Sequence, residues 1–315
     1  MAKQTLESLF EAMYHGKYDY RDFLSTPVSS LHRKVPLKNR IFHKADEKLQ
    51  AYHKFLNLFL FDFLKVNTEV VYSYRKGKNV IDAVQRHAKS RHFLKADLKN
   101  FFGSIDSSMI SSCILENSEN LPASDIHEHI ERIVSLVSFD NMLPPGFSTS
   151  PPLSNACLYG FDNKIESYCK NKELIYTRYS DDIIISGSTE RLYGLGNIVE
   201  SFLEESFSGK LQLNPAKTKY NTVGGKIKLL GVVILPGGEL TVDSKLKSKV
   251  EVMLHYYLTD RPNFNKIIEQ DTPKGLLSLS GYLNYINTTD PSYLDKLRLK
   301  YGATIVDMFI RGSVK

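Results

Sequence analysis

Two adjacent aspartates separate two short segments with strand character near the middle of the chain, and no other feature constrains the fold as strongly. Residues 174–179 and 183–186 are rich in β-branched and aromatic side chains, and Ser180, Asp181 and Asp182 lie between them. This spacing predicts a β-hairpin with both carboxylates near the bend. Bare adjacent charges repel each other and are costly to bury, so the pair is either solvated at an ordinary turn or neutralised by a cation.

A second acidic strand end favours the cation. Residues 92–96 have the pattern of a strand that delivers Asp97 at its end. Three carboxylates from two strand ends are the minimum set for two divalent ions that activate a 3′-hydroxyl and stabilise a leaving pyrophosphate. Mg²⁺ prefers carboxylate oxygens together with substrate phosphates. Strand alternation puts Asp181 and Asp182 on opposite sides, which predicts one direct ligand and one weaker ligand.

The rest of the chain alternates between helical and strand patterns, without a glycine-rich phosphate loop of the βαβ type. Asp106 is expected to cap a helix. Helices are predicted over 47–65, 79–90, 124–139 and 190–207, as one long helix from Pro151 to about Lys170, and through most of the tail from Asp243; further strands are predicted near 211–214 and 227–235. This order predicts an α+β fold with an antiparallel sheet.

Charge is distributed unevenly. Residues 1–95 carry 18 Lys/Arg against 9 Asp/Glu, residues 96–200 carry 7 against 15, and residues 201–315 carry 16 against 11. Basic flanks suit a polyanion if cations shield the acidic centre, although chance clustering on solvated faces is an equal alternative. The three cysteines have no CxxC spacing, which excludes a disulfide scaffold and a zinc knuckle. No apolar run reaches the length of about 18 residues that a membrane span needs, so a cytoplasmic protein is expected.

Four motifs follow one another along the chain. Residues 93–102 read FLKADLKNFF, 143–155 read LPPGFSTSPPLSN, 179–182 read YSDD and 213–218 read LNPAKT. In that order they resemble the first palm motif, the LPQGxxxSPxLxN segment, the YxDD box and the LNxxKT motif of reverse transcriptases, among them the bacterial retron-type and defence-associated enzymes. The resemblance covers about residues 30–305.

The resemblance implies a right-hand polymerase with fingers, an antiparallel-sheet palm and a helical thumb. Residues 1–90 would form the N-terminal region and fingers, 91–240 the palm with some fingers elements, and 241–315 the thumb. It also implies an RNA-directed DNA polymerase. With the chain used in this way, no length remains for an RNase H, maturase or endonuclease domain.

Roles for individual residues follow from the resemblance. Two Mg²⁺ ions would be held by Asp97, Asp181, Asp182 and the Leu98 carbonyl, and Lys217 would act as a general acid or as a positive charge beside the leaving pyrophosphate. The substrate-binding residues would be Lys38 and Arg40 for the phosphates, Phe102 as the gate against the ribose 2′-hydroxyl, with Phe101 in the core, and Gly146 and Tyr179 near the nucleotide, with Tyr176 and Tyr179 stacking on bases.

Three positions depart from the family pattern. Pro145 replaces the glutamine of LPQG, the asparagine expected upstream of His87 is missing, and Leu229-Leu230-Gly231 stands where retron enzymes have VTG. A related defence-associated branch therefore stays open. The implied partners are a structured noncoding RNA template and its DNA product, dNTPs and an effector protein on another chain, in antiviral defence. The alternatives are an inactive RNA-binding scaffold and an RNA-dependent RNA polymerase.

Overall fold

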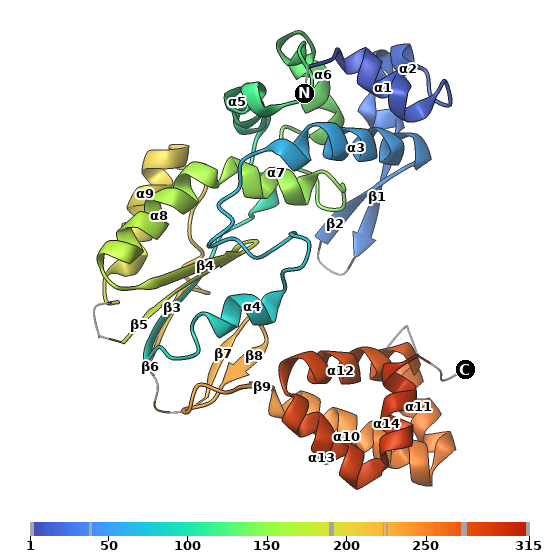
Figure 1. Ribbon diagram of the computed structural model, residues 1–315, viewed down its shortest axis with the longest axis vertical. Coiled ribbons are helices and arrows are strands. Elements are labelled where there is room, and N and C mark those ends of the chain that lie inside the picture. Colours follow the sequence, from blue (N-terminus) through green and yellow to red (C-terminus); the bar gives the residue numbers. More distant parts are fainter. Residues whose placement is uncertain are drawn as a thin grey trace. The chain divides into compact units, whose positions relative to one another are not determined.

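The computed structural model describes residues 3–37, 40–188, 192–222, 224, 226–271 and 276–312 (Figure 1). The chain divides into two compact units. Unit 1 consists of Met1–Asn79 and Phe93–Tyr220, and unit 2 consists of Val80–His92 and Asn221–Lys315. Among the described residues, no helix has both the length and the apolar character that crossing a membrane requires.

The N-terminal part of unit 1 combines three helices with a hairpin that the sequence patterns did not predict. These elements are α1 (Leu6–Tyr14), α2 (Tyr20–Ser25), the antiparallel pair β1 (His32–Leu37) and β2 (Arg40–Ala45), and α3 (Glu47–Phe59). Asp46 caps α3 because its carboxylate accepts a hydrogen bond from the Leu49 N–H at 2.8 Å. The helix predicted over 47–65 is too long, since Leu60 leaves the helical region and a 3₁₀ turn, η2 (Phe61–Phe63), follows.

A four-stranded sheet lies mostly within unit 1. Its strands lie in the order β4 (Ile175–Tyr179), β5 (Asp182–Gly187), β3 (His92–Asp97) and β6 (Lys219–Thr222). β4 and β5 pair antiparallel with Tyr179 opposite Asp182, which confirms the predicted hairpin. The strand predicted near 211–214 is wrong: within that segment Leu213 makes only an isolated bridge to Leu98, because a turn follows in which the Asn214 carbonyl accepts from the Lys217 and Thr218 N–H groups.

Further helices belong to unit 1. They are α5 (Ser107–Glu116), α6 (Ile126–Val137), α7 (Ser150–Cys157), α8 (Tyr159–Asn171) and α9 (Leu195–Phe207), with α8 in contact with β4 and α9 beside α8 (Figure 1). Asp106 caps α5 as expected, accepting from the Met109 N–H at 2.9 Å. The single long helix predicted from Pro151 is wrong. Its path breaks at Leu158, whose ψ of 7° is not helical and whose side chain is fully buried in the core.

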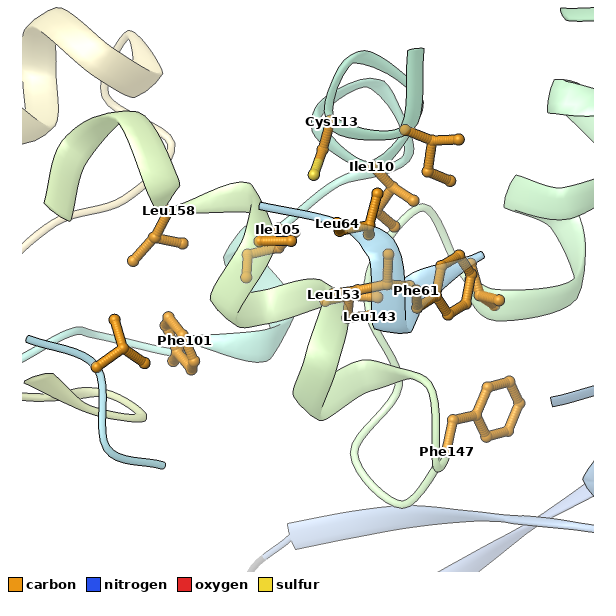
Figure 2. Close-up of a cluster of buried hydrophobic side chains, with 14 of the residues drawn as sticks. Phe61, Leu64, Phe101, Ile105, Ile110, Cys113, Leu143, Phe147, Leu153 and Leu158 are labelled. Carbon is orange, nitrogen blue, oxygen red and sulfur yellow. The ribbon is translucent and has the colours of Figure 1, made fainter. Parts of the chain in front are cut away.

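A hydrophobic core joins these helices to the segments that lead into the sheet. Figure 2 shows side chains from η2, α5 and α7 converging with those of two connecting segments. They include Phe61, Phe101, Ile105, Ile110, Leu143, Phe147, Leu153 and Leu158, each 5% exposed or less. Burial of this apolar surface fixes the frame from which the ends of β3, β4 and β5 project.

Unit 2 contains a small sheet and a bundle of helices. The sheet has the order β7 (Ile227–Leu229), β8 (Val232–Ile234) and β9 (Leu240–Val242), and α4 (Val80–Gln85) packs against β8. The strand structure predicted near 227–235 is present as two strands, because Leu230 and Gly231 adopt φ of 50° and 89° and turn the chain into a hairpin. The helix predicted over 79–90 extends only over 80–85.

The predicted helical tail is confirmed. It consists of α10 (Ser244–Thr259), α11 (Arg261–Asp271), α12 (Leu276–Thr289), α13 (Pro291–Tyr301) and α14 (Ala303–Ile310). Asp243 caps α10 through its carboxylate, which accepts from the Lys245 N–H at 2.9 Å. The bundle has its own core, which includes the fully buried Leu254, Leu283 and Phe309.

Candidate active site

Three carboxylates meet in one cavity of unit 1. Asp97 is the last residue of β3, and the turn between β4 and β5 supplies Asp181 and Asp182. Together with Lys95, Ala216, Lys217 and Lys219 they line a cavity of about 390 Å³. Asp181 lies in the turn and Asp182 begins β5, so strict strand alternation does not apply to the pair. Both line the cavity, and the expectation of one direct and one weaker ligand stays a prediction.

The turn that carries Asp181 has an unusual backbone. Its first residue, Ser180, adopts a φ of 58°, the positive sign that a type II′ turn needs at its first central position and that usually favours glycine. Several contacts hold it there. The Leu98 N–H donates to the Asp181 carbonyl at 2.9 Å, and the hydroxyls of Tyr74 and Ser180 lie 2.9 Å apart. A backbone hydrogen bond therefore joins the residue after β3 to the β4–β5 turn.

Asp97 is held by the segment that contains LNPAKT. The Lys217 Nζ lies 3.0 Å from one carboxylate oxygen, and the Asn214 side-chain amide donates to the other at 3.3 Å. The Asn214 N–H also donates to the Asp97 carbonyl at 2.7 Å. Asp97 is 6% exposed, so these contacts satisfy a nearly buried anion.

Lys95 is a site residue that the sequence reasoning missed. Its Nζ lies 3.3 Å from an oxygen of Asp182. A signal was present, because Lys95 and Asp97 are two residues apart in a strand and must share a face. Lys217, in the turn before β6, and Lys219, the first residue of β6, also line the cavity. Its described lining thus holds three aspartates and three lysines.

The electrostatics of the cavity favour a bound cation. Burial raises the pKa of Asp181 above its ordinary value, and the nearby negative charges of Asp182 and Asp97 raise it further. Each of these effects disfavours the charged carboxylate in the free protein. A cation placed among the three groups would reverse the balance, because opposite charge stabilises ionised carboxylates.

The donor set suits a hard divalent ion, although the side chains are not gathered into a finished site. Carboxylate oxygens are the ligands that Mg²⁺ prefers. Within the described ranges, no three His, Cys, Asp or Glu side chains stand close enough together to hold a metal. The ammonium groups of Lys95 and Lys217 instead bond to Asp182 and Asp97. The carboxylate oxygens are suitable metal ligands. For a metal to bind, Lys95 and Lys217 would have to move away from Asp182 and Asp97.

The aromatic residues divide into buried and accessible members. Phe101 is 5% exposed and packs in the core, as expected, whereas Phe102 is half-buried with its ring 6.5 Å from that of Tyr74. Tyr179 is half-buried too, and burial followed by the nearby Tyr74 raises its pKa. The stacking predicted for Tyr176 is wrong, since it is 4% exposed and its hydroxyl donates to Asp162 at 2.7 Å.

The remaining predicted residues do not line the carboxylate cavity. Gly146 has a φ of 108° and lies against β2, where a Cβ would come within 2.6 Å of the His43 carbonyl oxygen. Only glycine fits this position. Lys38 lies outside the described residues, as does the side chain of Arg40. The structure therefore brings together Asp97, Leu98, Asp181, Asp182 and Lys217, and it leaves Phe102, Gly146 and Tyr179 beyond the cavity lining.

The family model that matches this chain and three curated relatives are all reverse transcriptases. Residues 34–234 match the family model described as reverse transcriptase (RNA-dependent DNA polymerase). The chain is 24% identical over 260 residues to the retron Ec83 reverse transcriptase of Escherichia coli, covering 78% of this chain and 79% of the relative. It is 26% identical over 241 residues to retron Ec73 reverse transcriptase, covering 73% of each, and 22% identical over 314 residues to retron Ec86 reverse transcriptase, covering 96% and 89%, both also from E. coli.

Among solved structures, a telomerase from Candida albicans in complex with a fragment of telomeric RNA aligns with a TM-score of 0.49 and 10% identity. The alignment covers 94% of this chain and 61% of that one, so the chain spans less than two thirds of the telomerase.

Proposed function

Because the chain belongs to the reverse transcriptase family, we propose that the cavity lined by Asp97, Asp181 and Asp182 is the site at which it joins deoxynucleotides. Membership of this family, the α+β reverse transcriptase fold and RNA-directed DNA polymerase activity of the retron type are confirmed. The observation that carries the assignment of the site is the meeting of three carboxylates from two strand ends in one cavity.

We propose that this cavity takes two Mg²⁺ ions, with Asp97, Asp181, Asp182 and the Leu98 carbonyl as ligands. Ions bound there would activate a primer 3′-hydroxyl and neutralise the leaving pyrophosphate. Before the ions bind, Asp97 is nearly buried, and Lys217 and Lys95 neutralise Asp97 and Asp182. Side chains of Lys95 and Lys217 would then move toward the phosphates.

Lys217 is suited to the leaving group. Its side chain is 54% exposed although its Nζ bonds to Asp97, so it can change partners at little cost. We propose that it donates a proton to the pyrophosphate or acts there as a fixed positive charge. Lys95 would keep Asp182 oriented until the ions bind.

The motifs support a set of substrate contacts. Lys38 and Arg40 would bind the β- and γ-phosphates, with the arginine acting through its bidentate fork. Phe102 would exclude ribonucleotides, and Gly146 and Tyr179 would support the nucleotide. In this assignment residues 1–90 form the N-terminal region and fingers, 91–240 the palm and 241–315 the thumb.

We also propose a dedicated RNA partner. The relatives named above are retron reverse transcriptases, and the basic N-terminal and C-terminal thirds of this chain suit a polyanion. The protein would copy a structured noncoding RNA into DNA in the cytoplasm, with dNTPs as substrates, and would serve antiviral defence with an effector protein on another chain.

Primer extension tests the proposal. Purified protein is given a primed RNA template, Mg²⁺ and either dNTPs or rNTPs, beside an Asp181→Asn variant and an Asp295→Asn control. Asp295 is an exposed thumb residue in a surface ion pair with Arg298, so its loss should have little effect. We expect extension with dNTPs by the wild type and the control, and none by Asp181→Asn.

Other outcomes would replace the proposal. Extension with rNTPs alone would identify an RNA-dependent RNA polymerase, and no extension with either substrate would leave an RNA-binding scaffold. Expression with the neighbouring DNA, followed by sequencing of bound nucleic acid, tests the partner. One discrete RNA together with DNA copied from it is expected, whereas heterogeneous cellular RNA alone would contradict a dedicated template.

A further inference from the structure

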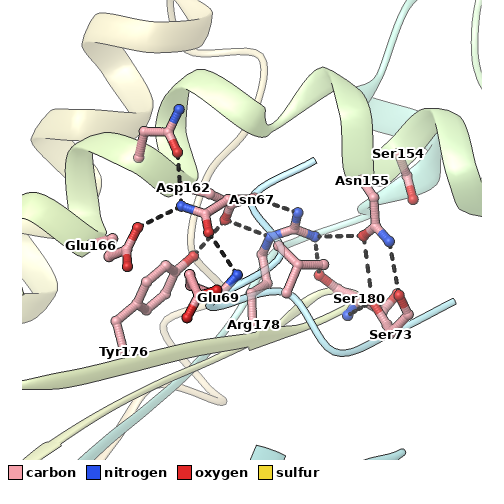
Figure 3. Close-up of polar contacts among 12 residues, drawn as sticks. Asn67, Glu69, Ser73, Ser154, Asn155, Asp162, Glu166, Tyr176, Arg178 and Ser180 are labelled. Atoms are coloured by element: carbon pink, nitrogen blue, oxygen red, sulfur yellow. Dashed lines mark hydrogen bonds and ion pairs between the residues drawn. The ribbon is translucent and has the colours of Figure 1, made fainter. Parts of the chain in front are cut away.

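A fully buried ion pair lies next to the β4–β5 turn, which contains Ser180 and Asp181. Arg178 on β4 and Asp162 on α8 are both 0% exposed. The guanidinium Nε donates to one carboxylate oxygen at 2.8 Å and Nη2 donates to the other at 2.6 Å, a bidentate fork (Figure 3). Burial opposes the charged arginine, but the carboxylate outweighs it and keeps the Arg178 pKa above its ordinary value. The buried guanidinium therefore keeps its positive charge.

Stability alone does not explain such a pair. Apolar residues of similar size are often at least as stabilising as a buried ion pair, because desolvation offsets the attraction. The third nitrogen of Arg178 indicates what else the pair does. Its Nη1 donates to the Ser180 carbonyl at 3.1 Å and to the Asn155 side-chain oxygen at 3.2 Å. The guanidinium thus reaches the backbone of the turn.

The other peptide group of Ser180 is held from the same side. Its N–H donates to the Ser73 hydroxyl at 2.8 Å, and the Asn155 amide donates to the Ser73 carbonyl at 2.8 Å. Figure 3 shows these residues as one connected set. A non-glycine residue with positive φ persists only where its surroundings determine it from several directions, and Ser180 meets that condition.

We propose that Arg178, held by Asp162 and Asn155, is a positioning residue that fixes the Ser180–Asp181 turn and so sets the Asp181 carboxylate relative to Asp97 for binding divalent cations. The chain of contacts is short: Arg178 and Ser73 fix the two peptide groups of Ser180, and the next residue carries the carboxylate. The inference rests on the proposed function, in which that carboxylate is a metal ligand.

The test separates positioning from folding. Arg178→Lys keeps the charge but loses the fork, and the double variant Asp162→Leu/Arg178→Met removes both charges. Arg132→Lys is the matched control, because Arg132 also donates to backbone carbonyls, those of Phe23 and Thr26, at 2.5 and 2.8 Å, but lies in neither the turn nor the cavity. Three quantities are measured: the melting temperature without metal, steady-state dNTP incorporation, and the affinity for Mn²⁺ from electron paramagnetic resonance.

For Arg178→Lys we expect kcat to fall about tenfold or more and the Mn²⁺ dissociation constant to rise about tenfold, with the dNTP KM within about twofold. Arg132→Lys should lower only the melting temperature. The double variant should recover part of the melting temperature lost in Arg178→Lys, since no unpaired charge stays buried, while kcat and Mn²⁺ affinity stay low.

Wild-type kcat and Mn²⁺ affinity in the double variant would overturn the proposal, as would equal effects of Arg178→Lys and Arg132→Lys. If neither Arg178 variant folds, Ser73→Ala decides: weaker Mn²⁺ binding supports positioning, and unchanged binding contradicts it. A wild type that binds Mn²⁺ but incorporates no dNTP would refute the proposed function, and the Mn²⁺ titrations would still judge the role of Arg178.

Discussion

A carboxylate pairs with a cationic side chain on each side of the β4–β5 turn, but the two pairs differ in burial. On the inner side, Asp162 and Arg178 are fully buried and bond through both carboxylate oxygens. In the cavity, Lys217 bonds to one oxygen of Asp97 while more than half of its side chain stays in solvent. Separating buried charges is expensive, whereas an exposed lysine exchanges partners readily. The inner pair is therefore a permanent part of the structure, whereas in the outer pair Lys217 can leave Asp97 when a cation binds.

The largest effect is expected at the cavity carboxylates. Asp97→Asn and Asp181→Asn should each reduce DNA synthesis by about 10³-fold or more, because a neutral amide cannot anchor the cations that stabilise the transferred phosphoryl group. RNA binding should be nearly unchanged, since basic residues elsewhere supply it. Single-turnover extension and filter binding measure the two effects. Retention of more than a tenth of the wild-type rate by both variants would refute the metal-site assignment.

The inner side should respond in stability. Asp162→Asn leaves a buried guanidinium without its counter-charge and should lower the free energy of unfolding by about 3–5 kcal/mol. Asp97→Asn should change it by less than about 1 kcal/mol, because its partner lysine is exposed. Urea unfolding followed by circular dichroism measures both variants. Similar losses would mean that burial does not distinguish the two pairs.

Phe101 and Phe102 repeat the contrast between a buried and an accessible neighbour. Phe101→Ala should cost about 3–5 kcal/mol of stability, as expected for a buried ring. Phe102→Ala should instead raise the ratio of rNTP to dNTP incorporation efficiency by at least about tenfold, because it opens space beside the sugar. Competition between matched nucleotides measures the ratio. An unchanged ratio would return Phe102 to a packing role.

A smaller effect is expected from substitution of Lys217. Lys217→Ala should slow incorporation by about 10- to 100-fold without abolishing it, since a proton or positive charge at the leaving group assists the reaction but does not replace the cations. Lys217→Arg, which keeps the charge, should retain more activity than alanine. Loss equal to that of Asp97→Asn would show that the lysine is indispensable.

Asp290 in unit 2 has a partner, Lys247, whose 28% exposure lies between that of Arg178 and that of Lys217. It is 7% exposed and accepts hydrogen bonds from Thr241, Lys247, Ser292 and the Tyr293 N–H. Although burial alone would raise its pKa, these donors lower the pKa below the ordinary value. The stability it contributes is therefore present above the unfolded pKa of about 3.9 and is lost as pH falls through the lower folded pKa.

Asp290→Asn keeps the helix cap of α13 but removes the charge. We expect the variant to be about 1 kcal/mol less stable than the wild type at pH 7, with the difference shrinking below about pH 4. Denaturant unfolding across this range measures the trend. A difference independent of pH would assign the effect to the shape of the side chain and not to its charge.

Features set by neighbouring residues were predictable from the sequence. The hairpin around YSDD, the strand that ends at Asp97 and the cap at Asp106 each depend on a few adjacent positions, and all three are confirmed. Features set by distant contacts were not. Arg178 looked like one polar residue in an apolar strand, because its partner Asp162 comes from a helix that packs on that strand.

The boundaries that failed have the same cause. The helix break at Leu158 follows from burial of that side chain in the core, and helical periodicity does not reveal it. The strand expected near 211–214 lies instead at Lys219–Thr222, because Asn214 and Lys217 are committed to a turn that holds Asp97. In both places a tertiary requirement overrides the local pattern.

The segment Val80–His92 belongs to unit 2, although most of that unit begins at Asn221. Its partners come late: α4 packs on β8, His92 bonds to Thr222 at 3.2 Å, and Gly238 sits close to the Ala88 carbonyl. During synthesis on a ribosome, at about 5–20 residues per second, this stretch must wait on the order of 10 s for them. Until β8 is made, α4 has no strand to pack on, and its apolar residues Ala83 and Val84 wait with it.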